Sequence, residues 1–317
     1  MNTHDLYTLL ISSPILALIA LALERWLPWP EQWHPLPMFR LFAQYLQTKV
    51  NKPGYSPEQQ RFAGAMAVVM LLFISLVPTA IVVYAADFSE ILGALVLLAC
   101  LRRQHYLKLL NKVDALALKQ QKRAARALLA RIDYRDTDQL SVHGLVKATA
   151  ELRAVSIIHH RWAPILAWLL GGPILALALR LISELYTLWP ISVSRYRTFG
   201  LPARAAYVLL IGPVTLLLTV TALLIAAFSN ARPAEPIKNS RAWVWPTGKW
   251  LDSLSRCHDI ALGGPIKVQG TRIERQRFAG RAPEQHNAQF RRAIARWHGY
   301  LILLLIVAVL LLFIYRP

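Results

Sequence analysis

The chain has 317 residues, of which 56% are hydrophobic, and 36 Lys and Arg residues against 17 Asp and Glu give it a formal net charge of +19. This apolar fraction is high for a soluble domain and points instead to a membrane protein. The two cysteines, Cys100 and Cys257, are far apart and show no metal-ligand spacing. We therefore expect reduced thiols, no disulfide and no metal site.

Six apolar stretches follow one another along the chain, at residues 6–23, 62–84, 91–101, 162–185, 205–228 and 300–315. Most are long enough, or nearly so, to cross a bilayer, which takes about 20 apolar residues in a helix. The third is only about half of that length. The pattern predicts an all-α, polytopic membrane protein with about five to six transmembrane segments and irregular cytoplasmic loops, forming a single domain over residues 1–317.

Basic residues are concentrated in two loops, 102–161 and 229–298, whereas residues 1–5 and the turn 85–90 contain no Lys or Arg. The positive-inside rule places such basic loops in the cytoplasm. We therefore expect a multi-pass protein of the bacterial inner membrane, with the lipid bilayer as its first partner. The loop 186–204 fits less well, because it would lie outside and yet carries Arg195, Arg197 and Arg204.

That exception raises an alternative for the fourth stretch, which contains Gly171, Gly172 and Pro173 at its middle. Gly and Pro interrupt a helix, and an interruption inside a membrane must be covered by protein or by a water-filled cavity. The stretch is either a kinked spanning helix or a re-entrant hairpin that returns residues 194–200 to the cytoplasm. Because Gly and Pro are common in membrane helices, the kinked helix is favoured.

The first basic loop predicts a long helix over residues 102–132, since apolar residues recur at helical spacing and neither Gly nor Pro occurs. Such a helix could pack on the other loops, lie on anionic lipid, or bind nucleic acid. No nucleic-acid recognition module accompanies the charge, so we expect no nucleic-acid partner. The second basic loop is rich in Pro and Gly, which predicts turns that pack against the membrane helices.

Generic catalytic motifs are few. Residues 247–249 contain a Gly-Lys pair but lack the remainder of a phosphate-binding loop. His159 and His160 are adjacent, so on a helix they diverge by about 100° and are not expected to share a metal ion.

Five short segments carry a resemblance to a known family: Trp33-His34-Pro35-Leu36, Ala148-Thr149-Ala150-Glu151 with Ala163-Pro164 after it, Arg195-Tyr196-Arg197-Thr198-Phe199-Gly200, Leu262-Gly263-Gly264-Pro265, and Gly270-Thr271-Arg272-Ile273-Glu274-Arg275. In this order and spacing they resemble the adenosylcobinamide-phosphate synthases, the CobD/CbiB membrane proteins of cobalamin biosynthesis. The resemblance runs over most of the chain.

The resemblance implies ATP-dependent formation of an amide between a corrin carboxylate and an aminopropanol phosphate, with ATP and Mg²⁺ required if the chain is active. It makes Glu151 and His34 the candidate catalytic residues, with Glu151 as a metal ligand or base. Arg195, Arg197 and the turn Gly263-Gly264 become candidates for binding substrate phosphate. The implied partner is a corrinoid substrate.

The chain departs from the family at several acidic positions. A Glu-Asn pair of the family falls on Val155 and Ser156, one Asp falls on His159 and another on Tyr186, and an Asp pair falls near Tyr207. Two hypotheses follow: a divergent enzyme, or a non-catalytic inner-membrane regulatory or binding protein similar to the AmpE-like relatives, with a membrane protein as partner. The missing carboxylates favour the second on chemical grounds.

Overall fold

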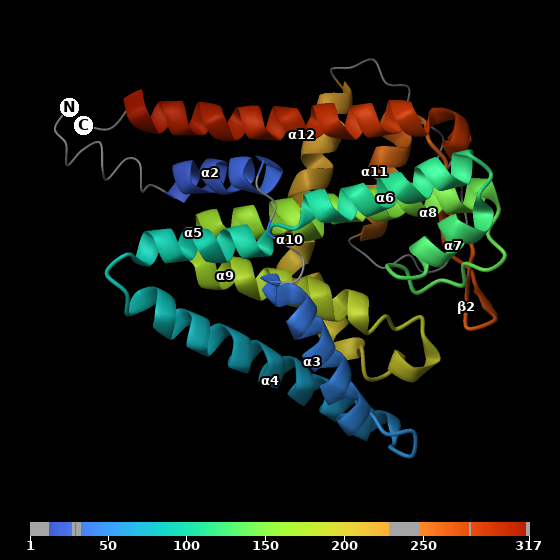
Figure 1. The fold of residues 1–317 in the computed structure, drawn as a ribbon, viewed down its shortest axis with the longest axis horizontal. Helices are drawn as coiled ribbons and strands as arrows, with labels where there is room; N and C mark the ends of the chain where they lie inside the picture. Colours follow the sequence, from blue (N-terminus) through green and yellow to red (C-terminus); the bar gives the residue numbers. More distant parts are fainter. Residues whose placement is uncertain (1–12, 27–28, 30–32, 228–246, 279, 315–317) are drawn as a thin grey trace.

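The computed structural model describes residues 13–26, 29, 33–227, 247–278 and 280–314 (Figure 1). Its helical elements are, in chain order, α2 (Ser13–Trp26), α3 (Pro35–Val50), α4 (Pro57–Tyr84), α5 (Ser89–Cys100), α6 (Arg103–Leu118), α7 (Lys122–Leu129), α8 (Val142–Ile157), the π-helical turn η2 (Ile158–Trp162), α9 (Ala163–Leu188), the 3-10 turn η3 (Ser194–Tyr196), α10 (Leu201–Ala227), α11 (Thr247–His258) and α12 (Pro283–Ile314). Two antiparallel strand pairs join β1 (Leu262–Gly263) to β4 (Arg277–Phe278), and β2 (Ile266–Val268) to β3 (Thr271–Ile273).

The expected all-α membrane architecture is confirmed, with fewer spans than expected. Four helical segments of the described chain are long and apolar enough to cross a bilayer: Pro57–Tyr84, Val142–Leu188, Leu201–Leu224 and Pro283–Leu311. Two other expected spans are short in the described residues, since α5 has 12 residues and α2 has 14. The expected beginning of the first span, residues 6–12, lies outside the described residues.

The segment around Gly171 and Gly172 does not continue in one direction, as the favoured kinked helix required, but folds back on itself. Gly172 (φ 72°, ψ −162°) occupies a backbone region that is essentially restricted to glycine. The rings of His159 and Tyr186, on either side of this break, have centroids 6.3 Å apart, whereas a straight helix with a rise of 1.5 Å per residue would separate them by about 40 Å. The helical hairpin was therefore the correct alternative.

The hairpin also accounts for the basic residues of the loop 186–204. Its return arm leads to η3, where the backbone N–H and the hydroxyl of Ser194 both donate to Oε1 of Gln269, at 3.2 Å and 2.7 Å. Gln269 belongs to the turn between β2 and β3 in the second basic loop. The arginines near η3 thus lie on the same side of the hairpin as the other basic loops, and the charge pattern has no exception there.

One end of the molecule is formed by α2, α5 and the C-terminal half of α12, which run side by side, and α7 and the strands lie at the other end (Figure 1). Large apolar side chains of α4 and α12 point outward, among them Phe73 with 64% of its surface exposed and Leu304 with 59%. Such exposed apolar surface is expected where lipid covers a helix.

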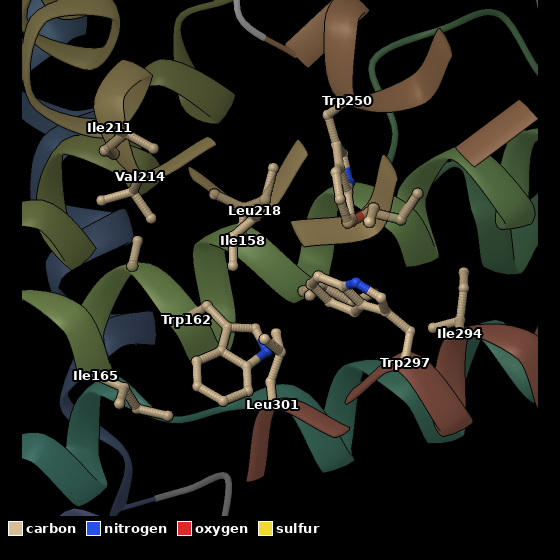
Figure 2. Packing of buried hydrophobic residues seen from close by; sticks show 14 of the residues in the cluster. Ile158, Trp162, Ile165, Ile211, Val214, Leu218, Trp250, Ile294, Trp297 and Leu301 are labelled. Carbon is tan, nitrogen blue, oxygen red and sulfur yellow. The ribbon is translucent and has the colours of Figure 1, made fainter. Parts of the chain in front are cut away.

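The hydrophobic core fixes α11 and α12 against the hairpin. Figure 2 shows Trp250 of α11 and Trp297 of α12 packed together, with ring centroids 5.1 Å apart. Trp250 Nε1 donates to the carbonyl oxygen of Ala154 in α8 at 2.9 Å, so the indole loses no hydrogen bond on burial. Ile158 and Leu218 are also buried in this cluster, which joins four elements that are distant in sequence.

The single helix expected over residues 102–132 is divided in two. α6 ends at Leu118 and α7 begins at Lys122, with Gln120 between them at a φ of 62°. The break allows α7 to fold back, so that its buried Leu129 shares a hydrophobic cluster with Leu145 of α8. Of the three interpretations of this basic helix, packing against another loop element is the one that the structure shows.

The second basic loop is more helical than its Pro and Gly content predicts. α11 occupies residues 247–258, and α12 begins at Pro283, well before the apolar stretch that starts at Tyr300. The proline at the first helical position is compatible with a helix start, because its missing N–H would have no partner there. Residues 228–246 of this loop lie outside the described residues.

Candidate functional site

A cavity of about 400 Å³ lies between the two arms of the hairpin and the polar loops. Its wall is formed by residues of α3, α6, the segment 131–135, α8, η2, the return arm of α9, the segment 190–192, α11 and the segment 273–275. The charged side chains on the wall are six arginines and three acids: Arg40, Arg102, Arg131, Arg135, Arg180 and Arg275, with Asp133, Glu151 and Glu184. Cations therefore outnumber carboxylates by two to one.

Glu151 is bound by three donors on the polar wall of the cavity. Its carboxylate accepts hydrogen bonds from Arg135 at 3.0 Å, from Arg275 at 3.0 Å, and from the backbone N–H of Gly263 at 2.8 Å. Only 2% of Glu151 is exposed, so each of these donors offsets part of the cost of burying its charge. A single carboxylate thus joins α8, the segment before it and the turn at β1.

The other two acids on the wall are also bound by arginine. Asp133 lies 2.5 Å from Arg135, and Glu184 lies 2.5 Å from Arg180 and 3.1 Å from Arg40. Mg²⁺ takes oxygen ligands in near-octahedral geometry. Since each wall carboxylate is committed to arginine, and the described residues contain no group of three His, Cys, Asp or Glu that could hold a metal ion, this donor set does not fit Mg²⁺.

Four of the positions at which the family's acidic or amide residues are replaced come together at this same cavity. Val155, Ser156, His159 and Tyr186 all line it, although Tyr186 lies far along the chain from the other three. The Ser156 hydroxyl donates to the carbonyl of Arg153 at 2.7 Å, inside its own helix. The sequence comparison and the fold therefore locate the same place, and no carboxylate stands at these four positions.

Aromatic rings fill much of the space that the replaced acids leave. Tyr186 and Tyr207 are stacked with ring centroids 3.9 Å apart and an interplanar angle of 10°. His159 Nε2 and the Tyr207 hydroxyl are hydrogen-bonded at 2.8 Å, and the same hydroxyl lies 3.1 Å from the Thr247 hydroxyl. These two contacts join η2, α10 and α11 through the Tyr207 hydroxyl.

The π-helical turn η2 places both adjacent histidines on the cavity wall. A π turn inserts an extra residue into a helix and is common at functional sites. His160 packs its ring against Tyr106 of α6, with centroids 4.7 Å apart. The sequence gave no sign of this π-helical turn.

His34, a candidate catalytic residue, is the N-cap of α3. Its Nδ1 accepts a hydrogen bond from the backbone N–H of Leu36 at 3.2 Å, and only 2% of the residue is exposed. Burial, followed by the positive charge of Arg180, lowers the pKa of His34 from 6.5 to about 4. His34 is therefore neutral near pH 7, and it is not among the described residues that line the cavity.

Arg195 and Arg197, the expected phosphate clamp, lie outside the cavity wall. With the Gln47 amide turned so that its oxygen faces Arg195, the Arg195 guanidinium donates to this oxygen through Nε and Nη2 at 3.0 Å and 3.1 Å, and the Arg195 carbonyl accepts from Asn51 at 2.9 Å. These bonds tie η3 to α3. Arg197 is exposed. Of the expected site residues, the structure brings only Glu151 and Gly263 into direct contact, and Gly264 is the next residue.

The arginines that do line the cavity were mostly missed in the sequence. Arg275 ends the last of the segments that resemble the family, but Arg135 and Arg180 stand in no motif. Arg180 lies inside the apolar stretch 162–185, where a charged residue is itself a signal for a site, whereas Arg135 was marked only by the excess of basic residues in the loops. That excess predicts which side of the membrane a loop occupies, and it does not distinguish an arginine on a cavity wall from one in solvent.

Comparison of the chain with protein families gives a match over residues 17–297 to the family model described as CobD/Cbib protein. Searches of curated proteins and of solved structures gave no match. The family match covers the hairpin, the cavity and both basic loops, and it links the chain to cobalamin biosynthesis. This chain belongs to the CobD/Cbib family.

Proposed function

We propose that this chain is a non-catalytic binding protein of the bacterial inner membrane, which holds a small phosphorylated or carboxylated ligand in the arginine-lined cavity. One observation carries the proposal: each carboxylate on the wall is bound to arginine, while arginines outnumber these acids. Arginine recognises carboxylate and phosphate in bidentate fashion. A cavity of about 400 Å³ lies within the range typical for small-molecule sites.

The charge pattern supports an orientation with the basic loops and the cavity on the cytoplasmic side. The interaction between Ser194 and Gln269 places the loop after the hairpin beside the second basic loop, so the arginines of both loops share one side. This is the arrangement that the positive-inside rule favours. The ligand would then enter from the cytoplasm.

A direct test uses aminopropanol phosphate, the small phosphorylated substrate that the family resemblance implies. Calorimetry on detergent-purified protein should show binding of this compound and none of aminopropanol, because the phosphate makes the contacts. Arg131→Met should weaken this binding, since Arg131 lines the cavity and forms no ion pair with a described carboxylate. Absence of binding, or equal binding of aminopropanol, would contradict the proposal.

The second candidate function is a divergent synthase, favoured by family membership and by Glu151 at the position that the resemblance assigns to catalysis. Removing one preorganised group that stabilises a transition state costs about 10²–10³ in rate, and several family acids are replaced together. We therefore expect no complementation of a strain that lacks its own synthase and must make cobalamin from cobyric acid. Growth that Glu151→Ala abolishes would establish the enzyme instead.

A further inference from the structure

The helix α3 carries a row of large apolar side chains on its outer face, although it is not among the four described segments that are long and apolar enough to cross a bilayer. Met38, Leu41, Phe42 and Tyr45 are exposed over 42% to 70% of their surface. Their spacing of three and four residues places them on one face of the helix. A helix on a water-exposed surface normally has polar side chains on this face.

The opposite face of α3 is covered by protein. Ala43 is buried in a hydrophobic cluster with Leu71 of α4 and Leu185 of α9. Arg40 also lies on this side, because it lines the arginine-lined cavity and its Nε is 3.1 Å from the carboxylate of Glu184. α3 therefore has apolar surface on both sides, and a helix of this kind is normally removed from water on both sides.

The outer face of α3 continues the lipid-facing surface of α4. The two helices pack against each other and are joined by the short connection 51–56 (Figure 1). Ala67 of α4 lies in the same hydrophobic cluster as α3, so this part of α4 runs beside it. On the opposite side of the same part of α4, Phe62, Met66 and Val69 are exposed. The outward-facing side chains of both helices thus form one apolar surface.

From this arrangement we infer that α3 lies partly in the bilayer, with its outer face covered by lipid acyl chains. Soluble proteins rarely leave a contiguous apolar surface of this kind exposed to water. Because the surface of α3 continues that of α4, the bilayer that covers α4 also covers α3. The helix that carries Arg40 is then packed between lipid on one side and the arginine-lined cavity on the other. The inference does not depend on which ligand the cavity binds.

The charges at the end of α3 fit this placement. Lys49 lies in the last turn of α3, Lys52 follows it, and Arg61 stands in the first turns of α4, so three cations gather at the end that the two helices share. Lys49 Nζ is 5.3 Å from the centre of the Tyr45 ring. Tyrosine is enriched where a membrane meets water, and lysine and arginine there attract anionic headgroups. This end of α3 is therefore suited to the headgroup region.

The test places a nitroxide spin label on the full-length protein through Leu41→Cys, with Cys257→Ser to remove the more accessible of the two native thiols. The protein is placed in nanodiscs of phosphatidylcholine and phosphatidylglycerol. Electron paramagnetic resonance then measures collisions of the label with oxygen, which concentrates among acyl chains, and with a neutral nickel chelate, which stays in water. The ratio of oxygen to nickel collisions at residue 41 should be several-fold higher than at a water-exposed position.

Leu118→Cys is the matched control, since Leu118 is also an exposed leucine but ends α6 in the first basic loop. Tyr45→Cys should give the same result as Leu41→Cys, because both side chains lie on one face of α3. Melting temperatures check that all variants are folded.

Two results would overturn the inference. If the label collides with the nickel chelate as often at residue 41 as at residue 118, the outer face of α3 lies in water. If the label at residue 41 is shielded from oxygen and from nickel alike, protein covers this face instead of lipid, and dipolar broadening between labels would identify that protein as a second copy of the chain.

Discussion

The Glu151 carboxylate accepts the backbone N–H of Gly263 at 2.8 Å, although the two residues are 112 positions apart. Both residues belong to segments that resemble the CobD/Cbib family, and the structure joins them through one buried hydrogen bond. Gly263 has a φ of +68°, and a Cβ there would lie 2.1 Å from the carbonyl oxygen of Gln276. The turn therefore has to be glycine for its N–H to reach Glu151.

Glu151→Gln should destabilise the protein strongly. The substitution removes the charge paired with Arg275 and one of the two carboxylates, with Asp133, that are paired with Arg135, and the side chains of Arg135 and Arg275 are only 9% and 10% exposed. Breaking such a buried ion pair typically costs about 3–5 kcal/mol, because an uncompensated charge stays inside. The melting temperature in detergent measures this loss.

Glu274→Gln is the matched control for that experiment. Glu274 pairs with Arg272 at 2.6 Å, but the two side chains are 64% and 67% exposed. An exposed pair contributes about 0–1 kcal/mol, so the melting temperature should change little. Similar shifts for both variants would show that the Glu151 cluster carries no special stability.

The helical hairpin predicts that cysteines introduced at Ser194 and Gln269 can be cross-linked by a short bis-maleimide reagent. The Ser194 hydroxyl lies 2.7 Å from Gln269 Oε1, so the two residues face each other across the length of the glutamine side chain. With this reagent the double variant Ser194→Cys with Gln269→Cys should become cross-linked in membranes, whereas each single variant should not. If the segment instead crossed the membrane once as a kinked helix, the two residues would lie on opposite sides and no cross-link would form.

Gly172→Ala should weaken folding through the backbone alone. The nearest atom to a Cβ at this position is the Tyr84 hydroxyl, 3.9 Å away, so the methyl group meets no steric obstacle. The φ of +72° with ψ of −162° should nonetheless cost about 1–3 kcal/mol in any residue other than glycine.

Gly54→Ala tests whether that loss is specific to the hairpin turn. Gly54 has no heavy atom within 4 Å of an added Cβ and no positive φ is recorded for it. Its melting temperature should stay close to that of the unmodified protein. If the Gly172→Ala variant has the same melting temperature as the Gly54→Ala variant, the turn at Gly172 does not require glycine.

We expect the protein to lose stability in acid because of His34. Its pKa is about 4 in the folded state against 6.5 for the free side chain, so the unfolded chain binds the proton more readily. The stabilisation by neutral His34 is fully present above pH 6.5 and is lost as the pH falls from 6.5 to about 4.

His34→Asn isolates that contribution, because Asn can still accept the Leu36 N–H as an N-cap but does not titrate. The free energy of unfolding, measured between pH 8 and pH 4, should fall less steeply for the variant than for the unmodified protein. Parallel curves would mean that His34 is not the group responsible.

The sequence alone determined that this is a helical membrane protein, because the length of an apolar stretch and the charge of a loop are local properties that decide how a chain inserts into a bilayer. It also located the break at Gly171-Gly172, since only the identity of these residues was needed. The direction of the chain after the break could not be predicted from the sequence. A kink and a hairpin differ only in contacts between residues far apart along the chain, such as that between His159 and Tyr186.

The cavity was likewise decided by the tertiary structure. The replaced positions Val155, Ser156, His159 and Tyr186 could be identified one by one in the sequence, but their meeting on one wall depends on the folding of the hairpin. Arg135 precedes the hairpin in the sequence and Arg275 follows it, yet both bind the carboxylate of Glu151. A charge in a sequence shows no partner, and whether an arginine is solvated, paired or free to bind a ligand depends on which other residues the fold brings within a few ångströms of it.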